Sequence, residues 1–339
     1  VEHRQACTIY QIYDYNHSDC HYLRSRAMTL TELRYIVAVS REKHFGRAAR
    51  ACHVSQPTLS IAIKKLEEEL GVQLFERKAS EITITPVGER IIEQAQRTLE
   101  AADGVRLAAR EGKDQLSGPV RIGAIYTIGP YLFPELIPRL RKHAPGMPLV
   151  IEENFTAVLA EKLKQGELDV IIISLPFSEQ GILTLPVYDE PFAVLLPASH
   201  PLTQRKSIGP KQLEDESVLL LGAGHCFRDQ VLEACPACLP KPGLEGELSS
   251  TVVGSSLETI RHMVVSGLGI TILPCTATGA DRYSQRLLSI RRFTRPAPSR
   301  TVALAWRVSY PRPKVIDAIS RSIAECGLTC VKPVRRKRV

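Results

Sequence analysis

One segment brings together the residue types of thiol redox chemistry: residues 222–238, which read GAGHCFRDQVLEACPAC. Within it, Cys226 lies between His225 and Arg228. A cysteine beside a base or a cation is favoured as the thiolate, which is its nucleophilic form. The segment therefore predicts a cysteine that attacks an oxidant.

A short helix is expected to position this thiol. After Cys226 the apolar residues recur at three-to-four spacing, which predicts an amphipathic helix over Phe227–Ala234 with Cys226 in its first turn. Gly222 and Gly224 allow a sharp turn just before it. In the first turn the thiolate also feels the positive end of the helix dipole.

The spacing of the next cysteine sets the geometry. Cys235 follows Cys226 by nine positions, and nine helical steps place the two α-carbons roughly 13 Å apart. A disulfide needs them within about 7 Å. Either these cysteines never meet, or oxidation melts and rebuilds the segment, as a redox switch would.

Two other interpretations of this segment compete. His225, Cys226, Cys235 and Cys238 supply the ligand types of a Cys₃His zinc site, but a shared helix start would strain two adjacent ligands. A buried structural thiol is the commonest fate of a free cysteine, and the flanking base, cation and glycine turn disfavour it. We therefore expect a redox cysteine that uses neither a metal nor a cofactor.

Composition limits the class of protein. The chain has 339 residues, too many for one ordinary core, so two or more domains are expected. Its net charge of +8 fits either a nucleic-acid partner or a solvated surface with a basic tail over residues 331–339. No apolar run approaches the roughly 18 residues of a membrane span. Residues 1–27 contain no apolar run like that of a signal peptide, and we expect them to be a disordered lead.

The cysteines indicate the compartment. Nine cysteines at irregular spacing argue against a secreted disulfide framework and favour a reducing, cytoplasmic compartment with mostly free thiols. Cys52 is expected in a core. Cys275, Cys326 and Cys330 lack a charged activating neighbour on both sides, so we expect them to be packing or exposed thiols.

The first domain, residues 28–85, reads as a helix-turn-helix. Its pattern predicts three helices followed by a two-stranded wing over Leu74–Thr85, the helices being Leu30–Arg41, Arg47–Cys52 and Gln56–Leu70. A short turn joins the second and third helices, as in DNA-binding proteins. An ordinary three-helix bundle without a nucleic-acid partner would show the same pattern.

The start of the third helix carries the expected DNA contacts. Ser55 is a good N-cap, Pro57 suits the first turn, and Gly71 can end the helix in the left-handed conformation. Small polar residues there would enter the major groove, and the lysines further along would meet phosphates. The predicted DNA-binding set is Ser55, Gln56, Pro57, Thr58, Ser60, Lys64, Lys65 and, in the wing, Arg77.

A long helix and an α/β domain follow. Pro86–Glu111 carries an apolar stripe that favours pairing with a second copy of the chain, so residues 86–117 form a dimerisation linker and hinge. From residue 118 to 330, apolar runs alternate with helical ones, which is typical of α/β folds with ligand chemistry at the carboxyl ends of strands. The predicted strands are Val120–Ile125, Leu149–Glu152, Val170–Ile173, Phe192–Leu196, Val218–Leu221, Ile270–Leu273 and Val302–Trp306. The predicted helices are Tyr131–Lys142, Ala157–Gln165, Phe227–Ala234, Leu257–Ser266 and Val315–Glu325.

These residues also carry a family resemblance. FGRAA at 45–49, VSQPTLS at 54–60 and IKKLEEELG at 63–71 resemble the LysR-type transcriptional regulators. Within that family, GHCFRDQ at 224–230 together with Cys235 resembles the members that sense hydrogen peroxide. The resemblance runs from Met28 to about Cys326.

The resemblance implies a winged helix-turn-helix, a linker helix and a two-lobed α/β regulatory domain like a periplasmic binding protein, with crossovers near Glu190 and Arg295. It implies Cys226 as the peroxide-reactive cysteine and Cys235 as the resolving one. Arg300 matches an arginine that holds the thiolate. The positions that match the peroxide pocket are Thr127, Thr156, His225, Arg228 and Asp229.

The implied partners are promoter DNA, RNA polymerase, a cellular dithiol reductant and three further copies of the chain in a tetramer. We expect a regulator and not an enzyme. Cys238 departs from the family pattern and competes with Cys235 as resolving partner. Two alternatives stay open: a regulator that answers a small organic ligand between the lobes, and a thiol peroxidase.

Overall fold

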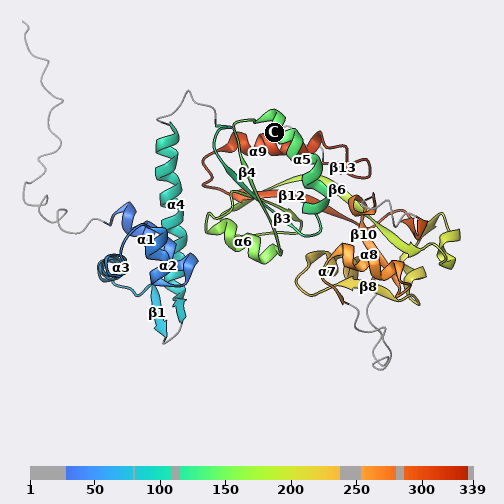
Figure 1. Cartoon of the computed structure of the whole chain (residues 1–339), viewed down its shortest axis with the longest axis horizontal. Helices are drawn as coiled ribbons and strands as arrows, with labels where there is room; N and C mark the ends of the chain where they lie inside the picture. The colour runs from blue at the N-terminus through green and yellow to red at the C-terminus, as the bar shows by residue number, and fades with distance from the viewer. Residues whose placement is uncertain (1–27, 79–80, 109–114, 237–252, 280–285, 335–339) are drawn as a thin grey trace, which may run out of the picture. The chain divides into compact units, whose positions relative to one another are not determined.

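The computed structural model describes residues 28–78, 81–108, 115–236, 253–279 and 286–334 (Figure 1). The expected lead at 1–27, Cys238 and the last five residues of the basic tail lie outside these ranges. The chain divides into two compact units, residues 1–99 and 100–339, and the division falls within helix α4 (Pro86–Ala108). None of the described helices is long and apolar enough to cross a membrane.

The first unit is a winged helix-turn-helix. Helices α1 (Leu30–Glu42), α2 (Phe45–Ala51) and α3 (Gln56–Leu70) pack around a core in which Ile36, Leu59 and Ile63 are fully buried. Strands β1 (Phe75–Lys78) and β2 (Glu81–Ile84) form the antiparallel wing. This is the architecture that the sequence predicts.

Local hydrogen bonds set the helix ends. The Ser55 hydroxyl accepts a hydrogen bond from the Thr58 amide at 3.3 Å, and Gly71 ends α3 at a φ of 67°. The prediction that α2 begins at Arg47 is wrong by two residues. His44 is its N-cap, because the imidazole Nδ1 accepts from the amides of Gly46 and Arg47.

The apolar stripe of α4 has two environments. Ile92 and Ala95 are buried in the core of the first unit, whereas Val105 is 71% exposed. The sequence predicts that this stripe pairs with a second copy of the chain, whereas its first half packs into the core of the first unit. Gly88 allows α4 to lie close to the backbone at Leu74, because a Cβ at this position would lie 2.4 Å from the Leu74 carbonyl oxygen.

The second unit contains two lobes, each with its own core. In the first lobe, strands adjoin in the order β4 (Leu149–Asn154), β3 (Val120–Ile125), β5 (Val170–Ser174), β12 (Ser299–Arg307) and β6 (Ile182–Pro197). β3 is parallel to β4 and β5, and β12 is antiparallel to β5 and β6. The helices of this lobe are α5 (Gly129–His143), α6 (Thr156–Lys164) and α9 (Pro313–Ala324).

The second lobe continues the same sheet path. Beyond β6 lie β10 (Ile270–Pro274), β8 (Val218–Leu221) and β9 (Val253–Gly254). β11 (Leu288–Phe293) also pairs with β6, and β7 (Ser207–Ile208) pairs with β11. Its helices are α7 (Cys226–Ala234) and α8 (Leu257–Val265). The short 3₁₀ turns are η2 (Pro201–Gln204), η3 (Pro210–Leu213) and η6 (Cys275–Gly279).

Two segments cross between the lobes. Strand β6 pairs with β12 up to Pro191 and with β10 from Phe192 onward. Residues 294–298 return the chain from β11 to β12. The crossings near Glu190 and Arg295 are therefore present, and the fold is two-lobed like a periplasmic binding protein. Strand β13 (Lys332–Pro333) lies against β6 beside the first crossing.

Several strands escaped sequence reasoning. The predicted strand Phe192–Leu196 is only the end of the 16-residue β6, because Pro186, Asp189 and Pro191 interrupt its apolar pattern. Only the end residues of β11, Leu288 and Phe293, are buried, and Arg291 and Arg292 interrupt its apolar pattern. β7, β9 and β13 have two residues each, too few for any periodicity.

The buried face of α9 provides a test of this packing. Ile319 is fully buried in the first lobe and Ile151 on β4 is 37% exposed. Ile319→Ala should lower the free energy of unfolding by about 3 kcal/mol, and Ile151→Ala by less than about 1 kcal/mol. Denaturant unfolding followed by fluorescence of Trp306, the sole tryptophan, measures both. Equal losses would contradict the assignment of this face to the core.

Candidate functional site

Cys226 is the first residue of α7. The turn from β8 to this helix contains Gly224 at a φ of 93°, and His225 is the helix N-cap. The thiol therefore lies at the N-terminal, positive end of the helix dipole. The predicted turn, helix and position of Cys226 are confirmed.

The cysteines at the two ends of α7 belong to different cores. Cys226 is half-buried and packs against the core of the first lobe, whereas Cys235 is fully buried in the core of the second. Neither forms a disulfide within the described residues. The intact helix Cys226–Ala234 stands between them, so a bond between their sulfurs requires the helix to unwind.

A narrow pocket opens at the Cys226 thiol. The space available to the centre of a water-sized molecule is about 10 Å³, enough for roughly one such molecule. Three of the predicted pocket residues, Thr127, Thr156 and His225, line it together with Cys226. The remaining wall residues are Ile125, Tyr126, Asn154, Phe155 and Gly224.

Two hydroxyl groups give the pocket its polar character. The Thr127 hydroxyl accepts a hydrogen bond from Arg300 Nη1 at 2.7 Å, which leaves its own proton available to donate. The Thr156 hydroxyl oxygen is buried and has no hydrogen-bond partner among the described residues. A buried polar group without a partner is costly, so this geometry favours a small polar occupant.

Arg300 holds the pocket residue Thr127 in place through hydrogen bonds. Its Nε donates to Glu190 at 2.7 Å, its Nη2 donates to the Thr127 carbonyl at 2.8 Å, and both side chains of the ion pair are fully buried. The guanidinium carbon also lies 5.2 Å from the centre of the Phe227 ring. The resemblance implied that Arg300 holds the thiolate. In the described part of the chain its hydrogen bonds go to Thr127 and Glu190, and none reaches Cys226.

His225 is held as a neutral base. Burial lowers its pKa, and a hydrogen bond to the backbone of Ser255 opposes this shift. The ring packs against Phe155, with centroids 4.8 Å apart. A neutral imidazole leaves one nitrogen free to accept a proton from the pocket.

Two predicted pocket residues lie elsewhere. Arg228 donates to the Leu221 carbonyl at 2.8 Å, and Asp229 is exposed in the first turn of α7. Neither is among the lining residues of the pocket. Gln230 reaches the first lobe instead, because its Nε2 donates to Ser174 Oγ at 2.8 Å.

The missed wall residues had a usable signal. Tyr126 follows β3, and Asn154 and Phe155 stand at the end of β4. These two strands are parallel, so their carboxyl ends meet at one edge of the sheet. Each missed residue also lies within two positions of a predicted one in the chain.

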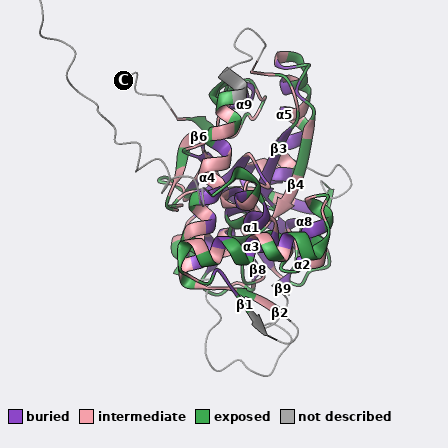
Figure 2. Cartoon of the chain, turned by 90° about the vertical axis from the view of Figure 1, so that its left-hand side faces the viewer, coloured by how far each residue is buried: buried purple, intermediate pink, exposed green. Residues whose placement is uncertain are grey.

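The predicted DNA contacts lie on α3. Gln56, Pro57 and Thr58 are exposed in its first turn, and Lys64 and Lys65 are exposed further along; Figure 2 shows exposed residues along this helix. Lys64 lies 3.8 Å from Glu68 in an ion pair, while Lys65 has none among the described residues. Ser55 serves as the N-cap, Ser60 is half-buried, and Arg77 belongs to β1 of the wing.

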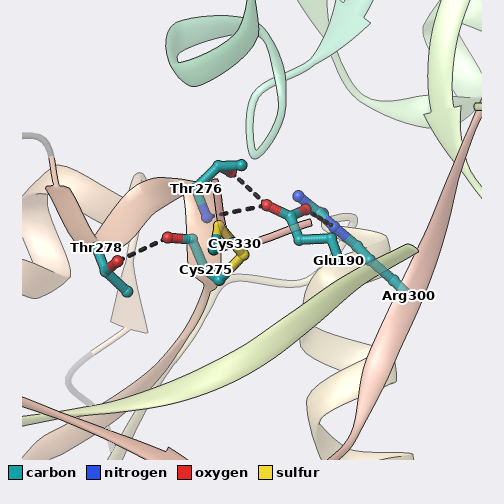
Figure 3. Close-up of a disulfide and its surroundings, with 6 residues drawn as sticks. All are labelled: Glu190, Cys275, Thr276, Thr278, Arg300 and Cys330. Carbon is teal, nitrogen blue, oxygen red and sulfur yellow. Dashed lines mark hydrogen bonds and ion pairs between the residues drawn. A yellow bond between two sulfur atoms is a disulfide. The ribbon is translucent and has the colours of Figure 1, made fainter. Parts of the chain in front are cut away.

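One cysteine prediction is wrong. Cys275 and Cys330 form a disulfide with α-carbons 6.1 Å apart (Figure 3), although both were expected to be free thiols. They are 55 residues apart in sequence, and only the lobe arrangement brings them together. Burial raises the pKa of Cys326 to about 11 and also raises that of Cys52, so these two remain protonated thiols. No three histidine, cysteine or acidic side chains within the described ranges are grouped as metal ligands.

Comparison with known proteins identifies the family. Residues 30–89 match the bacterial regulatory helix-turn-helix of the LysR family, and residues 113–326 match the LysR substrate-binding domain. The hydrogen peroxide-inducible genes activator of Dickeya chrysanthemi is 35% identical over 298 residues, which are 88% of this chain and 95% of the relative. The chain belongs to the LysR family and, within it, to the OxyR proteins.

Solved OxyR structures support this assignment. A full-length OxyR of Pseudomonas aeruginosa, with aspartate replacing a cysteine, is 55% identical, has a TM-score of 0.80, and covers 92% of this chain and 100% of its own. A hydrogen peroxide-bound OxyR variant of Corynebacterium glutamicum is 32% identical with a TM-score of 0.59, covering 89% of this chain and 93% of its own. The regulator OxyR of Escherichia coli K12 is 35% identical over 87% of this chain and 95% of its own.

The buried His225 makes stability depend on pH. Because its pKa is lower in the folded state than in the unfolded chain, the unfolded state binds more protons as the pH falls through about 6.5. The wild type should therefore lose stability between about pH 7 and pH 5 more steeply than His225→Gln. Denaturant unfolding at a series of pH values, followed by Trp306 fluorescence, measures the difference. Parallel pH profiles would show that His225 is not held neutral by burial.

Proposed function

We propose that this chain is a DNA-binding transcriptional regulator that senses hydrogen peroxide through oxidation of Cys226, followed by disulfide formation with Cys235. The observation that carries the proposal is the Cys226 pocket. It combines a thiol at a helix N-terminus with two hydroxyl groups, and admits about one water-sized molecule.

The first chemical step is nucleophilic attack. The Cys226 thiolate attacks one oxygen of peroxide, the O–O bond breaks, and hydroxide leaves as Cys226 becomes a sulfenic acid. Thr127 and Thr156 can donate hydrogen bonds to the peroxide oxygens, and neutral His225 can accept a peroxide proton. A tight pocket holds the reacting atoms in line.

The second step changes the fold. The Cys235 thiol attacks the Cys226 sulfenic sulfur, the S–S bond forms, and water leaves. Because α7 separates the two residues, it must unwind, and this withdraws Phe227, Val231 and Cys235 from the core of the second lobe. A chemical change at one sulfur thereby becomes a rearrangement of a lobe. Thiol–disulfide exchange with a cellular dithiol reductant resets the pair.

The other parts of the proposal follow the family. Helix α3 binds promoter DNA, the chain works as a tetramer in the cytoplasm, and the switched form acts on RNA polymerase to control antioxidant genes. The alternative of a small organic ligand finds little support at the Cys226 pocket, since such ligands occupy cavities of roughly 300 Å³ or more. We propose a regulator and not an enzyme; steady peroxide consumption with a dithiol reductant would indicate a thiol peroxidase instead.

Cysteine variants test the switch directly. After one equivalent of peroxide, wild-type protein should lose two hydrogens, about 2 Da, with Cys226 and Cys235 peptides linked. Cys235→Ser should stop at a sulfenic acid on Cys226 that dimedone traps. Cys226→Ser should show neither product while binding DNA as the wild type does. Peptide mapping by mass spectrometry and a DNA-binding titration measure these outcomes.

The matched control is Cys326→Ser, which removes another half-buried thiol and should leave the switch intact. A link between Cys226 and Cys238 would transfer the resolving role to Cys238. If Cys226 stays unmodified in the wild type, the sensing mechanism is wrong.

The DNA interface is tested by salt dependence. Lys65 on α3 should neutralise one phosphate, so Lys65→Ala should lower the slope of log K against log salt by about 1. Lys211→Ala, at an exposed position of the second lobe, should leave the slope unchanged. Fluorescence anisotropy with a labelled duplex of random sequence measures both. Equal slopes for Lys65→Ala and the wild type would remove this lysine from the interface.

A further inference from the structure

The Cys275–Cys330 disulfide joins the two lobes. Cys330 follows α9, and its neighbours Leu328 and Val331 pack against the core of the first lobe. Cys275 begins η6, whose Ala277 is buried in the core of the second lobe. The bond therefore adds a covalent link between the lobes, beside the two chain crossings near Glu190 and Arg295.

We propose that Cys275 and Cys330 form a second redox site, chemically separate from Cys226 and Cys235, which opens and closes as a clasp between the lobes and adjusts the Cys226 pocket. The part that concerns the pocket rests on the function proposed above. The redox site itself does not.

A chain of hydrogen bonds connects the clasp to the pocket. Thr276, the residue after Cys275, donates from its amide to Glu190 Oε1 at 3.1 Å, and its hydroxyl bonds the same oxygen. Figure 3 shows Glu190 between Thr276 and Arg300, beside the disulfide. Arg300 in turn holds both the hydroxyl and the carbonyl of Thr127, which lines the pocket at Cys226.

The C-terminal segment is fixed at the same place. Just beyond Cys330, strand β13 pairs with β6, with Lys332 opposite Asp189 in the antiparallel register. The Val334 amide also donates to the Val187 carbonyl at 3.2 Å. The closed clasp thus ties this short segment to the crossing strand next to Glu190. When the clasp opens, few backbone hydrogen bonds hold this segment. The covalent link from Cys275 to Cys330 then no longer holds the adjacent Thr276 beside Glu190.

The backbone allows this bond to form without rearrangement. The Cα atoms of Cys275 and Cys330 are 6.1 Å apart, within the range of ordinary disulfides, whereas Cys226 and Cys235 require α7 to unwind. A disulfide in a protein of a reducing compartment is more often redox-sensing than structural. We therefore assign this pair to the thiol–disulfide balance of the cell, and the α7 pair to peroxide.

The exchange chemistry balances with a small disulfide of the glutathione class as oxidant. The half-buried Cys330 thiolate attacks one sulfur of the small disulfide, which forms a mixed disulfide and releases one thiolate. The Cys275 thiolate then attacks the Cys330 sulfur, closes the clasp, and releases the second thiolate. Two protein thiols are oxidised, one small disulfide is reduced to two thiols, and the two protein protons pass to the released thiolates.

A redox titration of the full chain tests the site. The protein is equilibrated with mixtures of reduced and oxidised glutathione, quenched with N-ethylmaleimide, and mapped by mass spectrometry. The Cys275–Cys330 link should titrate as a two-electron couple within the range of cellular mixtures, in the wild type and equally in Cys226→Ser. A link that stays fully closed, or fully open, across that range overturns the proposal.

A kinetic measurement tests the coupling. Cys330→Ser should oxidise at Cys226 with a rate constant about fivefold lower than the wild type with a closed clasp, because Thr127 is less firmly positioned. Cys326→Ser is the matched control and should keep the wild-type rate. Equal rates in all three proteins overturn the coupling. If Cys226 does not react with peroxide in any of them, the proposed function fails, while the glutathione titration still decides the clasp.

Discussion

The buried ion pair between Arg300 and Glu190 is the interaction on which the two-lobed second unit depends. Both side chains are fully buried, at the point where β6 passes from one lobe to the other. A buried charge that loses its partner typically costs about 3–5 kcal/mol, so the two residues are expected to stay together. The Nη1 and Nη2 atoms of Arg300 donate to the hydroxyl and the carbonyl of Thr127. The ion pair thereby fixes Thr127, in one wall of the Cys226 pocket, to the β6 crossing at Glu190.

This arrangement explains how a small pocket and a large rearrangement coexist. Thr127 and Thr156 belong to the first lobe, and α7 belongs to the second. Cys226 touches the core of the first lobe from the end of a helix of the second. A reaction that pulls Cys226 toward Cys235 therefore unwinds α7 and also breaks the contact between Cys226 and the first lobe. Packed interfaces of this kind change between discrete arrangements rather than continuously.

Much of this was accessible from the sequence because the signals were local. The turn at Gly224, the first turn of α7 and the caps at Ser55 and Gly71 each follow from a few adjacent residues. Thr127 and Thr156 were found through family resemblance, and the parallel pairing of β3 with β4 explains why they meet. Arg228 and Asp229 were placed in the pocket through the same resemblance, but they do not line it. A helix turns neighbouring side chains to different faces, and Arg228 bonds the Leu221 carbonyl instead.

The disulfide marks what sequence reasoning could not reach. Charged neighbours indicate which cysteine is reactive, and that criterion found Cys226 while passing over Cys275 and Cys330. Pairing depends on a different property, the distance between two backbone positions, which here is set by the crossing of β6 and by the docking of β13. The Cys226–Cys235 and Cys275–Cys330 pairs thus differ both in the setting of their thiols and in the distance between their backbones. One has a thiol in an activating setting and a backbone that resists closure; the other has a backbone ready for closure and lacks that setting. A chain with both can respond to a fast oxidant at the first pair and to the slower thiol balance at the second.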